Sequence, residues 1–288
     1  MIILENEKLR VVISPKGAEL QSLINKETGL EYMWSGDAAF WSKHSPILFP
    51  VVGALKEDTY FYKDKPYHLP RHGFARERTF LKDQLSLEEA VFTLTHDAET
   101  LAVYPFAFLL KLRYQLKGNS LFCTNEVSNT GYDELLFSVG AHPAFAVPMV
   151  KDTLYKDYYL QFNKTEPLHR WKLEGGLITD HTELLPTQND RLPLTHELFY
   201  EDAIVLKNML SNSITVGCTK HDHGIHFNFE NFSFFGIWAS KDANFICLEP
   251  WCGIADSVQH NQQLINKEGI ITLTPNTNWQ HCWNVECF

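Results

Sequence analysis

Short stretches in which apolar and polar residues alternate recur along almost the whole chain, and turn-forming residues separate them. The clearest stretches are 8–14, 90–96, 108–116, 121–128, 214–219, 225–229, 234–239 and 270–274. Alternation of this kind is typical of β-strands, because successive side chains of a strand point to opposite faces. Gly118 and Asn119 separate two such stretches and predict a tight β-hairpin between them.

Helical periodicity is nearly absent from the chain, and we expect only short helical segments at residues 37–43 and 193–200. Many short strands with frequent turns predict an all-β sandwich or barrel. No linker rich in proline, glycine or serine interrupts the pattern, so we expect one domain over residues 1–288, built from two packed, mostly antiparallel sheets. A chain of 288 residues can bury a large core without disulfides or metals.

The overall charge and the cysteines exclude several classes of protein. The net charge is −10, whereas nucleic-acid binding and anionic membrane surfaces require basic patches. The chain has no long apolar stretch and no signal-peptide pattern at its start, so we expect no membrane partner. The six cysteines are scattered without a CxxC pair, which predicts reduced thiols and a cytoplasmic protein.

Two of the polar segments that interrupt the strand pattern contain a histidine. In LPRHGFARER, His72 lies beside a glycine and between Arg71 and Arg76, whose side chains can donate to several ligand oxygens. A solvated surface loop would have the same composition. In GAHPAF, His142 follows an apolar strand, and it can give and take back a proton near neutral pH. A buried histidine bonded to a backbone carbonyl is the structural alternative.

Two further segments contain a carboxylate. In CLEPWCGIAD, Glu249 interrupts an apolar run at the end of a predicted strand, where burial would raise its pKa and make it a better base. A carboxylate in a salt bridge would be the structural alternative. In YEDAIVL, Asp202 precedes an apolar strand and is either a ligand for hydroxyl groups or a turn residue.

His221, His223 and His226 form the one histidine-rich segment, HDHGIH. We expect no metal site there, because a turn signal falls at His223 and residues three apart on a strand face opposite sides. The chain has no P-loop, no GxGxxG after a strand and no GxSxG, so the mechanisms that use these motifs find little support.

Taken together, five segments in order resemble the aldose 1-epimerase family, and specifically its LacX-type branch. They are SPKGAELQSLINKETGLEYMW, SPILFPVVG, RHGFAR, GAHPAF and LEPWCGIAD. The resemblance implies a galactose-mutarotase-like β-supersandwich with an open active-site cleft and no cofactor. One departure is Ala54, where many relatives have an arginine after FPVVG, and this weakens the case for a phosphorylated substrate.

The resemblance also implies roles for individual residues. His142 corresponds to the general acid that protonates the sugar ring oxygen, and Glu249 to the general base on the anomeric hydroxyl. His72 corresponds to a histidine that binds the sugar near its ring oxygen. Asp202 is expected to hold sugar hydroxyls, and Arg71 and Arg76 are candidate sugar or anion contacts. The implied function is interconversion of the α and β anomers of a free aldohexose such as galactose or glucose.

Other functions are compatible with the same fold. A hexose-6-phosphate 1-epimerase needs cations that converge on a phosphate, which Arg71, Arg76 and Arg78 are available to supply. A non-catalytic sugar-binding protein is the second alternative. A glycoside hydrolase is less well supported, because such enzymes use two carboxylates. Trp238, Trp251 and Phe74 belong either to a sugar-stacking face or to the core. We expect a small-molecule sugar as the partner, and a monomer or weak homodimer.

Overall fold

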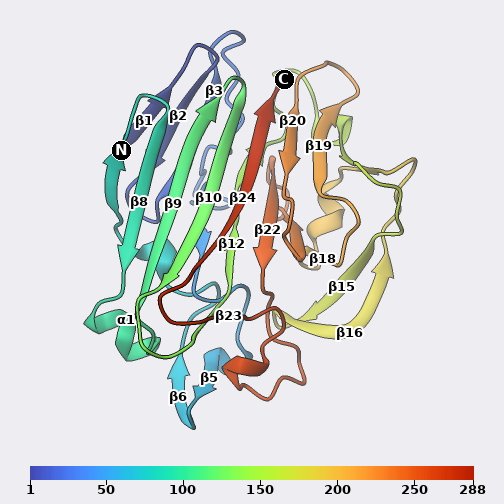
Figure 1. Ribbon diagram of the computed structural model, residues 1–288. Coiled ribbons are helices and arrows are strands. Elements are labelled where there is room, and N and C mark those ends of the chain that lie inside the picture. Colours follow the sequence, from blue (N-terminus) through green and yellow to red (C-terminus); the bar gives the residue numbers. More distant parts are fainter.

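The computed structural model describes residues 1–288 and consists mainly of β-strands, most of them in two large sheets (Figure 1). All pairings within these two sheets are antiparallel. The prediction of an all-β fold with mostly antiparallel sheets is therefore confirmed. No helix is long and apolar enough to span a membrane.

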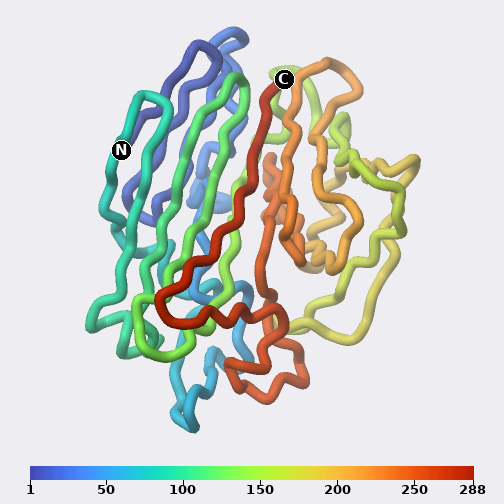
Figure 2. The backbone as a smooth tube through the Cα atoms, in the orientation of Figure 1, coloured from blue at the N-terminus to red at the C-terminus, as the bar shows by residue number.

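The larger sheet has nine strands, in the spatial order β17 (Arg191–Pro193), β14 (Tyr158–Phe162), β19 (Ser213–Cys218), β20 (Ile225–Asn228), β24 (Asn278–Cys287), β10 (Ser120–Asn129), β9 (Phe108–Lys117), β8 (Glu89–Thr95) and β7 (Leu81–Gln84). The C-terminal strand β24 lies between β10 and β20, so the end of the chain joins its middle segments into one sheet (Figure 2). In β9 and β10 buried residues alternate with partly exposed ones, as the sequence pattern predicts.

The second sheet has eight strands. They follow the order β16 (Leu177–Leu184), β15 (His169–Glu174), β18 (Ile204–Lys207), β21 (Phe234–Trp238), β22 (Phe245–Cys252), β12 (Val139–Ala141) and β4 (Ile47–Leu48), with β13 (Ala144–Ala146) also paired to β22. Strand β22 is buried along its whole length, which explains why its sequence is apolar rather than alternating.

Smaller elements complete the fold. A three-stranded sheet contains β1 (Ile2–Glu5), β2 (Leu9–Ser14) and β3 (Glu19–Asn25), and two pairs contain β11 (Leu135–Phe137) with β23 (Ile271–Leu273) and β5 (Thr59–Tyr62) with β6 (Lys65–His68). The only α-helix is α1 (Ala98–Val103), and short 3₁₀ turns occur at Lys56–Asp58, Ala75–Glu77, Tyr155–Asp157, His196–Phe199 and Leu264–Asn266. One apolar core extends from β1 to β24.

Of the two expected helical segments, residues 193–200 contain a short 3₁₀ helix, His196–Phe199, whereas the other segment differs. Residues 37–43 form a turn rather than a helix, in which the N–H groups of Phe40 and Trp41 both donate to the Asp37 carbonyl. The aromatic rings of that segment instead pack on other aromatic residues of the fold. Helix α1 was not predicted. It is stabilised by a reciprocal capping box between Asp97 and Thr100, a short signal that the periodicity of six residues does not reveal.

Strand β22 also continues further than the sequence suggests. Glu249 lies within it rather than at its end, because the strand runs through Pro250 to Cys252. On one side, β22 pairs first with β13 and then with β12, and Pro250 falls at the change of partner. Proline has no backbone N–H to donate to the ladder, and it is tolerated at this position because the pairing is interrupted there.

Candidate active site

A cleft of about 220 Å³ opens on one face of the eight-stranded sheet. Its walls come from β15, β16, β18, β21 and β22 and from the loops that carry the polar motifs. It is lined by Trp41, Gly53, Arg71, His72, Arg76, His142, Leu173, Gly176, Ile178, Asp202, Ala203, Val205, Trp238, Glu249, Trp251, Ile254 and Ala255. All six residues that the sequence proposes for the site therefore lie in one cavity, although they come from four separate segments.

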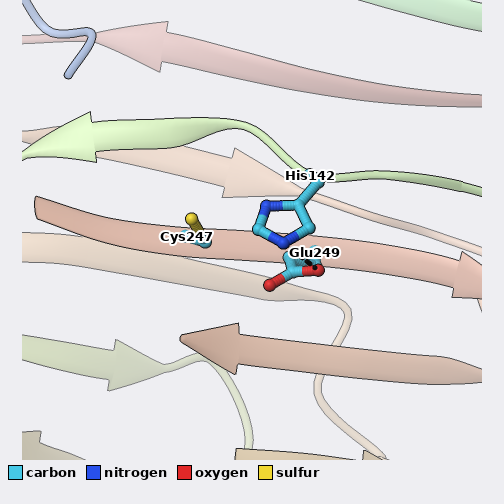
Figure 3. A group of neighbouring side chains, drawn as sticks. All are labelled: His142, Cys247 and Glu249. Atoms are coloured by element: carbon cyan, nitrogen blue, oxygen red, sulfur yellow. Dashed lines mark ion pairs between the residues drawn. The ribbon is translucent and has the colours of Figure 1, made fainter. Parts of the chain in front are cut away.

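His142 and Glu249 face each other in this cleft. The Nε2 atom of His142 lies 3.2 Å from Oε2 of Glu249, and both side chains are almost fully buried (Figure 3). His142 occupies the short connection between β12 and β13, whereas Glu249 projects from β22, to which both of those strands pair. The second ring nitrogen of His142, Nδ1, is buried without a hydrogen-bond partner.

Burial shifts the pKa values of this pair in opposite directions. Burial raises the pKa of Glu249 well above its usual range. The neighbouring Trp251 indole and the charge of Arg71 lower this pKa, but by less than burial raises it. Burial also lowers the pKa of His142 to about 3, and the charge of Arg76 adds to this. Both shifts favour the uncharged forms, so the carboxyl and the imidazole share one proton.

The backbone of Gly53 fixes the position of His72. Its N–H donates to the Gly53 carbonyl, and its Nδ1 accepts a hydrogen bond of 3.1 Å from the Gly53 N–H. Because Nδ1 is an acceptor, the ring proton lies on Nε2, which is therefore a hydrogen-bond donor. Burial and the adjacent His142, Arg76 and Arg71 lower the pKa of His72 well below its usual range, so the ring is neutral.

Arg71 and Arg76 bring positive charge to the cleft without forming an ion pair with any carboxylate. The guanidinium of Arg76 donates only to the backbone carbonyl of Arg71, at 3.0 Å. The guanidinium of Arg71 lies against Gly176, where any Cβ would come within 1.8 Å of Nη2. Guanidinium groups without a carboxylate partner remain available to bind the oxygens of a ligand.

Asp202 lies two residues before β18. One carboxylate oxygen accepts a 2.7 Å hydrogen bond from the N–H of Ala203, and its backbone carbonyl accepts one from the buried Arg170. These contacts fix the backbone of the loop. The carboxylate remains part of the cleft lining and faces the same cavity as Glu249, whose pKa it helps to raise.

The floor of the cleft contains the flat indole of Trp251. Two glycines leave room for it, because a Cβ on Gly140 or Gly236 would approach its ring atoms to 2.6 Å and 2.3 Å. Gly140 on β12 pairs with Trp251 of β22, and Gly236 on β21 pairs with Glu249 of β22. The indole Nε1 is a buried donor without a partner. Aromatic faces of this kind are favourable surfaces for the apolar face of a ligand ring.

The structure adds Trp41, which the sequence interpretation did not propose. Its indole stacks on the His142 imidazole with ring centres 5.0 Å apart, and it meets Trp238 edge to face at 5.5 Å. Trp238 also contacts the His142 ring at 5.6 Å. Two tryptophans therefore enclose the histidine on two sides. No local signal marks Trp41, because the segment was expected to be helical and the contact depends on tertiary packing.

Three other groups lie away from the cleft. Arg78 pairs with Glu99 at 2.6 Å and is therefore not available to the phosphate site considered above. Phe74 packs in the core against Phe49 and Phe108. The His221 and His223 rings lie 5.8 Å apart, and His221 bonds Tyr158, whereas His226 bonds Thr215 and stacks on Phe288.

Comparison with known proteins places the chain in a family. The model of the aldose 1-epimerase family matches residues 1–285. The chain belongs to the aldose 1-epimerase family. Chromosomal protein LacX of Lactococcus lactis subsp. lactis is 34% identical over 285 residues, which cover 95% of each chain. The plasmid-borne LacX of the same organism is 33% identical over the same length.

Solved structures of the family share the fold. A galactose mutarotase-like protein from Lactobacillus casei ATCC 334 is 35% identical, with a TM-score of 0.94 and complete coverage of both chains. A galactose mutarotase related enzyme from Lactobacillus acidophilus is 33% identical, with a TM-score of 0.95 and coverage of 100% of this chain and 97% of that one. The predicted galactose-mutarotase-like fold is thus confirmed over the full length.

Proposed function

We propose that the protein is an aldose 1-epimerase that interconverts the α and β anomers of a free aldohexose, such as galactose or glucose. The observation that carries the proposal is the contact between His142 Nε2 and Glu249 Oε2, 3.2 Å apart at the cleft. Mutarotation moves protons on two oxygens bonded to the same carbon. An acid and a base for these two oxygens must therefore lie side by side, as this pair does.

The single proton of the pair is sufficient for the reaction. When the proton is on His142, the Glu249 carboxylate takes the proton of the anomeric hydroxyl, and His142 protonates the ring oxygen as the bond from that oxygen to the anomeric carbon breaks. The resulting aldehyde rotates about the bond to its neighbouring carbon. Ring closure from the other face reverses both proton transfers and restores the pair. Each well-placed acid or base contributes about 10²–10⁴-fold in rate.

The remaining residues of the cleft support binding of a sugar. The Nε2–H of His72 and the Nε1–H of Trp251 are donors, and the Asp202 carboxylate is an acceptor. The Trp251 face provides an apolar surface for the ring carbons. Arg71 lies close enough to Glu249 to lower the pKa of that carboxyl, and thus favours its ionised form during catalysis.

The test is the rate at which freshly dissolved α-glucose or α-galactose reaches anomeric equilibrium, followed by polarimetry or proton NMR with and without the protein. We expect acceleration by the wild type, and its loss in Glu249→Gln and His142→Ala. Binding of a sugar without any acceleration would instead indicate a sugar-binding protein on this fold.

A second candidate, a hexose-6-phosphate 1-epimerase, is favoured by one observation. Arg71 and Arg76 lie at the cleft without carboxylate partners, and a phosphate would supply the missing negative charge. On this alternative, glucose 6-phosphate is turned over far better than glucose. Arg71→Ala or Arg76→Ala then lowers kcat/KM for the phosphate ester by about tenfold or more, because charge-assisted hydrogen bonds are lost.

Arg78→Ala is the matched control for these two variants. Its guanidinium comes from the same motif but pairs with Glu99 outside the cleft. An unchanged kcat/KM for the phosphate ester in Arg71→Ala and Arg76→Ala would exclude the second candidate. Equal losses for free and phosphorylated sugar would assign these arginines to the sugar hydroxyls.

A further inference from the structure

Cys247 lies beside the His142–Glu249 pair, and the three residues are the one group in the chain whose side chains match a metal-binding arrangement. Their ligand atoms, the thiol sulfur, an imidazole nitrogen and a carboxylate oxygen, all lie within 4.8 Å of one another. Cys247 and Glu249 are two residues apart on β22, so their side chains project from the same face of the strand. Figure 3 shows the sulfur to the left of the His142 ring and the carboxylate below it, both next to β22.

We propose that a thiophilic divalent cation, Zn²⁺ or Cd²⁺, binds to His142, Cys247 and Glu249 and blocks the cleft. Sulfur, nitrogen and oxygen donors of this kind bind zinc at about 2.0–2.3 Å in a tetrahedral arrangement, which puts ligand atoms roughly 3.5 Å apart. His142 and Glu249 are already at 3.2 Å. The sulfur lies within 4.8 Å of the other two ligand atoms, so tetrahedral ligation requires it to approach by up to about 1.3 Å.

The chemistry of the donors selects the cation. A thiolate favours soft ions such as Zn²⁺ and Cd²⁺, whereas Mg²⁺ and Ca²⁺ require oxygen ligands. Binding releases two protons to solvent, the thiol proton and the proton shared by His142 and Glu249, since only the thiolate, the carboxylate and a free imidazole lone pair are ligands. His142 and Glu249 line the cleft, whereas Cys247 does not, and three protein ligands leave a fourth position of the tetrahedron for a water molecule.

Metal binding at this position opposes catalysis rather than supporting it. The cation occupies the lone pair of His142 and an oxygen of Glu249, which are the atoms that move protons in the proposed reaction. The inhibition therefore rests on the proposed function, whereas the binding itself does not. A saturating sugar is expected to compete with the metal, because both need the same two side chains.

The strand also offers a matched control. Cys252 lies on β22 as well, but it is an odd number of residues from Cys247 and Glu249 and so projects to the opposite face. Cys252 is also buried, with 6% of its surface exposed, so its replacement disturbs the same strand without touching the proposed site. Cys282, the one cysteine that is only partly buried, serves as a second control for binding at an accessible thiol.

The experiment titrates the metal-stripped full chain with Cd²⁺ and follows the thiolate-to-cadmium absorption band in the ultraviolet. We expect one Cd²⁺ per chain in the wild type, in Cys252→Ser and in Cys282→Ser. In Cys247→Ser the band disappears, and affinity falls by at least about tenfold, the loss that follows even when only an outer partner of a metal site is removed. An unchanged band in Cys247→Ser, or a band that vanishes in either control, would overturn the proposal.

Glu249→Gln provides a second test if Cys247→Ser does not fold. This variant keeps the thiol but loses the carboxylate, so we expect the band to remain visible only at cadmium concentrations at least about tenfold higher. In the activity assay, Zn²⁺ should inhibit the wild type and Cys252→Ser, with reversal by EDTA. Tight Cd²⁺ binding to an active enzyme without inhibition would overturn the blocking role. An enzyme with no activity leaves the absorption test valid, so the two proposals fail separately.

Discussion

Glu249 and Asp256 belong to the same short segment, LEPWCGIAD, and both carboxyl groups are almost completely buried, with 2% and 1% of the residues exposed. Their surroundings differ. Glu249 has the His142 imidazole 3.2 Å away, whereas Asp256 accepts hydrogen bonds from the Lys267 ammonium at 2.8 Å and the Lys56 N–H at 3.0 Å, with His260 3.2 Å away.

The pKa values follow from these surroundings. Burial raises the pKa of Glu249 well above its usual range. Burial acts on Asp256 in the same sense, but His260, the charge and hydrogen bond of Lys267 and the Lys56 N–H outweigh it and lower its pKa to about 2. The pKa of Lys267 is lowered as well, because the desolvation of this fully buried ammonium outweighs the charge and hydrogen bond of Asp256 and the charge of Glu268.

The comparison separates a structural carboxylate from a reactive one. Removing one partner of a buried, fully hydrogen-bonded ion pair is costly to the fold, and Asp256 is such a partner in the loop that follows β22. A buried carboxyl that lacks such partners stays ready to exchange its proton, which is what an acid–base group requires. The two buried carboxyl groups of one motif thus have different roles, and the number of hydrogen-bond donors around each group decides its role.

The largest effect is expected from the catalytic pair. Glu249→Gln and His142→Ala should each lower the rate of anomer exchange by about 10²–10⁴-fold, because either change removes one proton carrier. The free energy of unfolding should change little in Glu249→Gln, since the variant removes a poorly solvated carboxyl and keeps its shape. Urea denaturation checks the stability, and full activity in either variant contradicts the assignment.

Asp256→Asn should show the opposite pattern. It leaves the buried Lys267 ammonium without a counter-charge, and such losses cost about 3–5 kcal/mol of the free energy of unfolding. The rate per folded molecule should be largely retained. The exposed pair of Asp133 with Lys63 gives a control, since Asp133→Asn should change stability by no more than about 1 kcal/mol. A loss of activity without a loss of stability in Asp256→Asn would contradict the structural role assigned to Asp256.

Acid should lower the stability that Asp256 provides without affecting the activity that depends on His142 in the same way. The pKa of Asp256 is depressed from 3.8 to about 2, so its contribution of about 2 kcal/mol is present above pH 3.8 and lost as the pH falls toward 2. Asp256→Asn should abolish this part of the acid sensitivity in urea denaturation. The pKa of His142, about 3, predicts no loss of kcat/KM between about pH 7 and pH 5. A loss centred near pH 6.5 would show that His142 titrates as an ordinary histidine.

The smallest effect is expected at Trp41. A stacked aromatic contact contributes about 0.5–1.5 kcal/mol, so Trp41→Ala should lower kcat about two- to tenfold and shift the acid limb of the pH profile upward as water reaches His142. Trp41→Phe keeps the stacking and should restore most of the rate. Equal effects of both substitutions would assign Trp41 to general packing rather than to positioning His142.

Much of the fold could be predicted, because local alternation decides it. The hairpin of β9 and β10 was placed to within about one residue, since Gly118 and Asn119 fix its turn. The turn at residues 37–43 could not be predicted, because aromatic packing overrides its helical composition. Helix α1 was missed because six residues carry no periodic signal.

Site residues could be predicted from the sequence only where a polar residue interrupts an apolar strand. His142 and Glu249 interrupt apolar runs, and the structure brings both into one cleft. Trp41, Gly140 and Gly236 have no such contrast, and their roles depend on neighbours distant in the chain. The contrast between Glu249 and Asp256 was equally invisible, since the donors of Asp256 come from Lys56 and Lys267, on either side of the motif in the chain.

The most direct test is a ¹³C NMR titration of the side-chain carboxyls in metal-free protein, with Glu249→Gln and Asp256→Asn used to assign the two signals. The account predicts that Glu249 takes up its proton at a pH well above its ordinary pKa of 4.5, whereas Asp256 stays ionised until about pH 2. If Glu249 instead titrates at or below 4.5, it is a satisfied structural carboxylate like Asp256, and the proposed acid–base pair is contradicted.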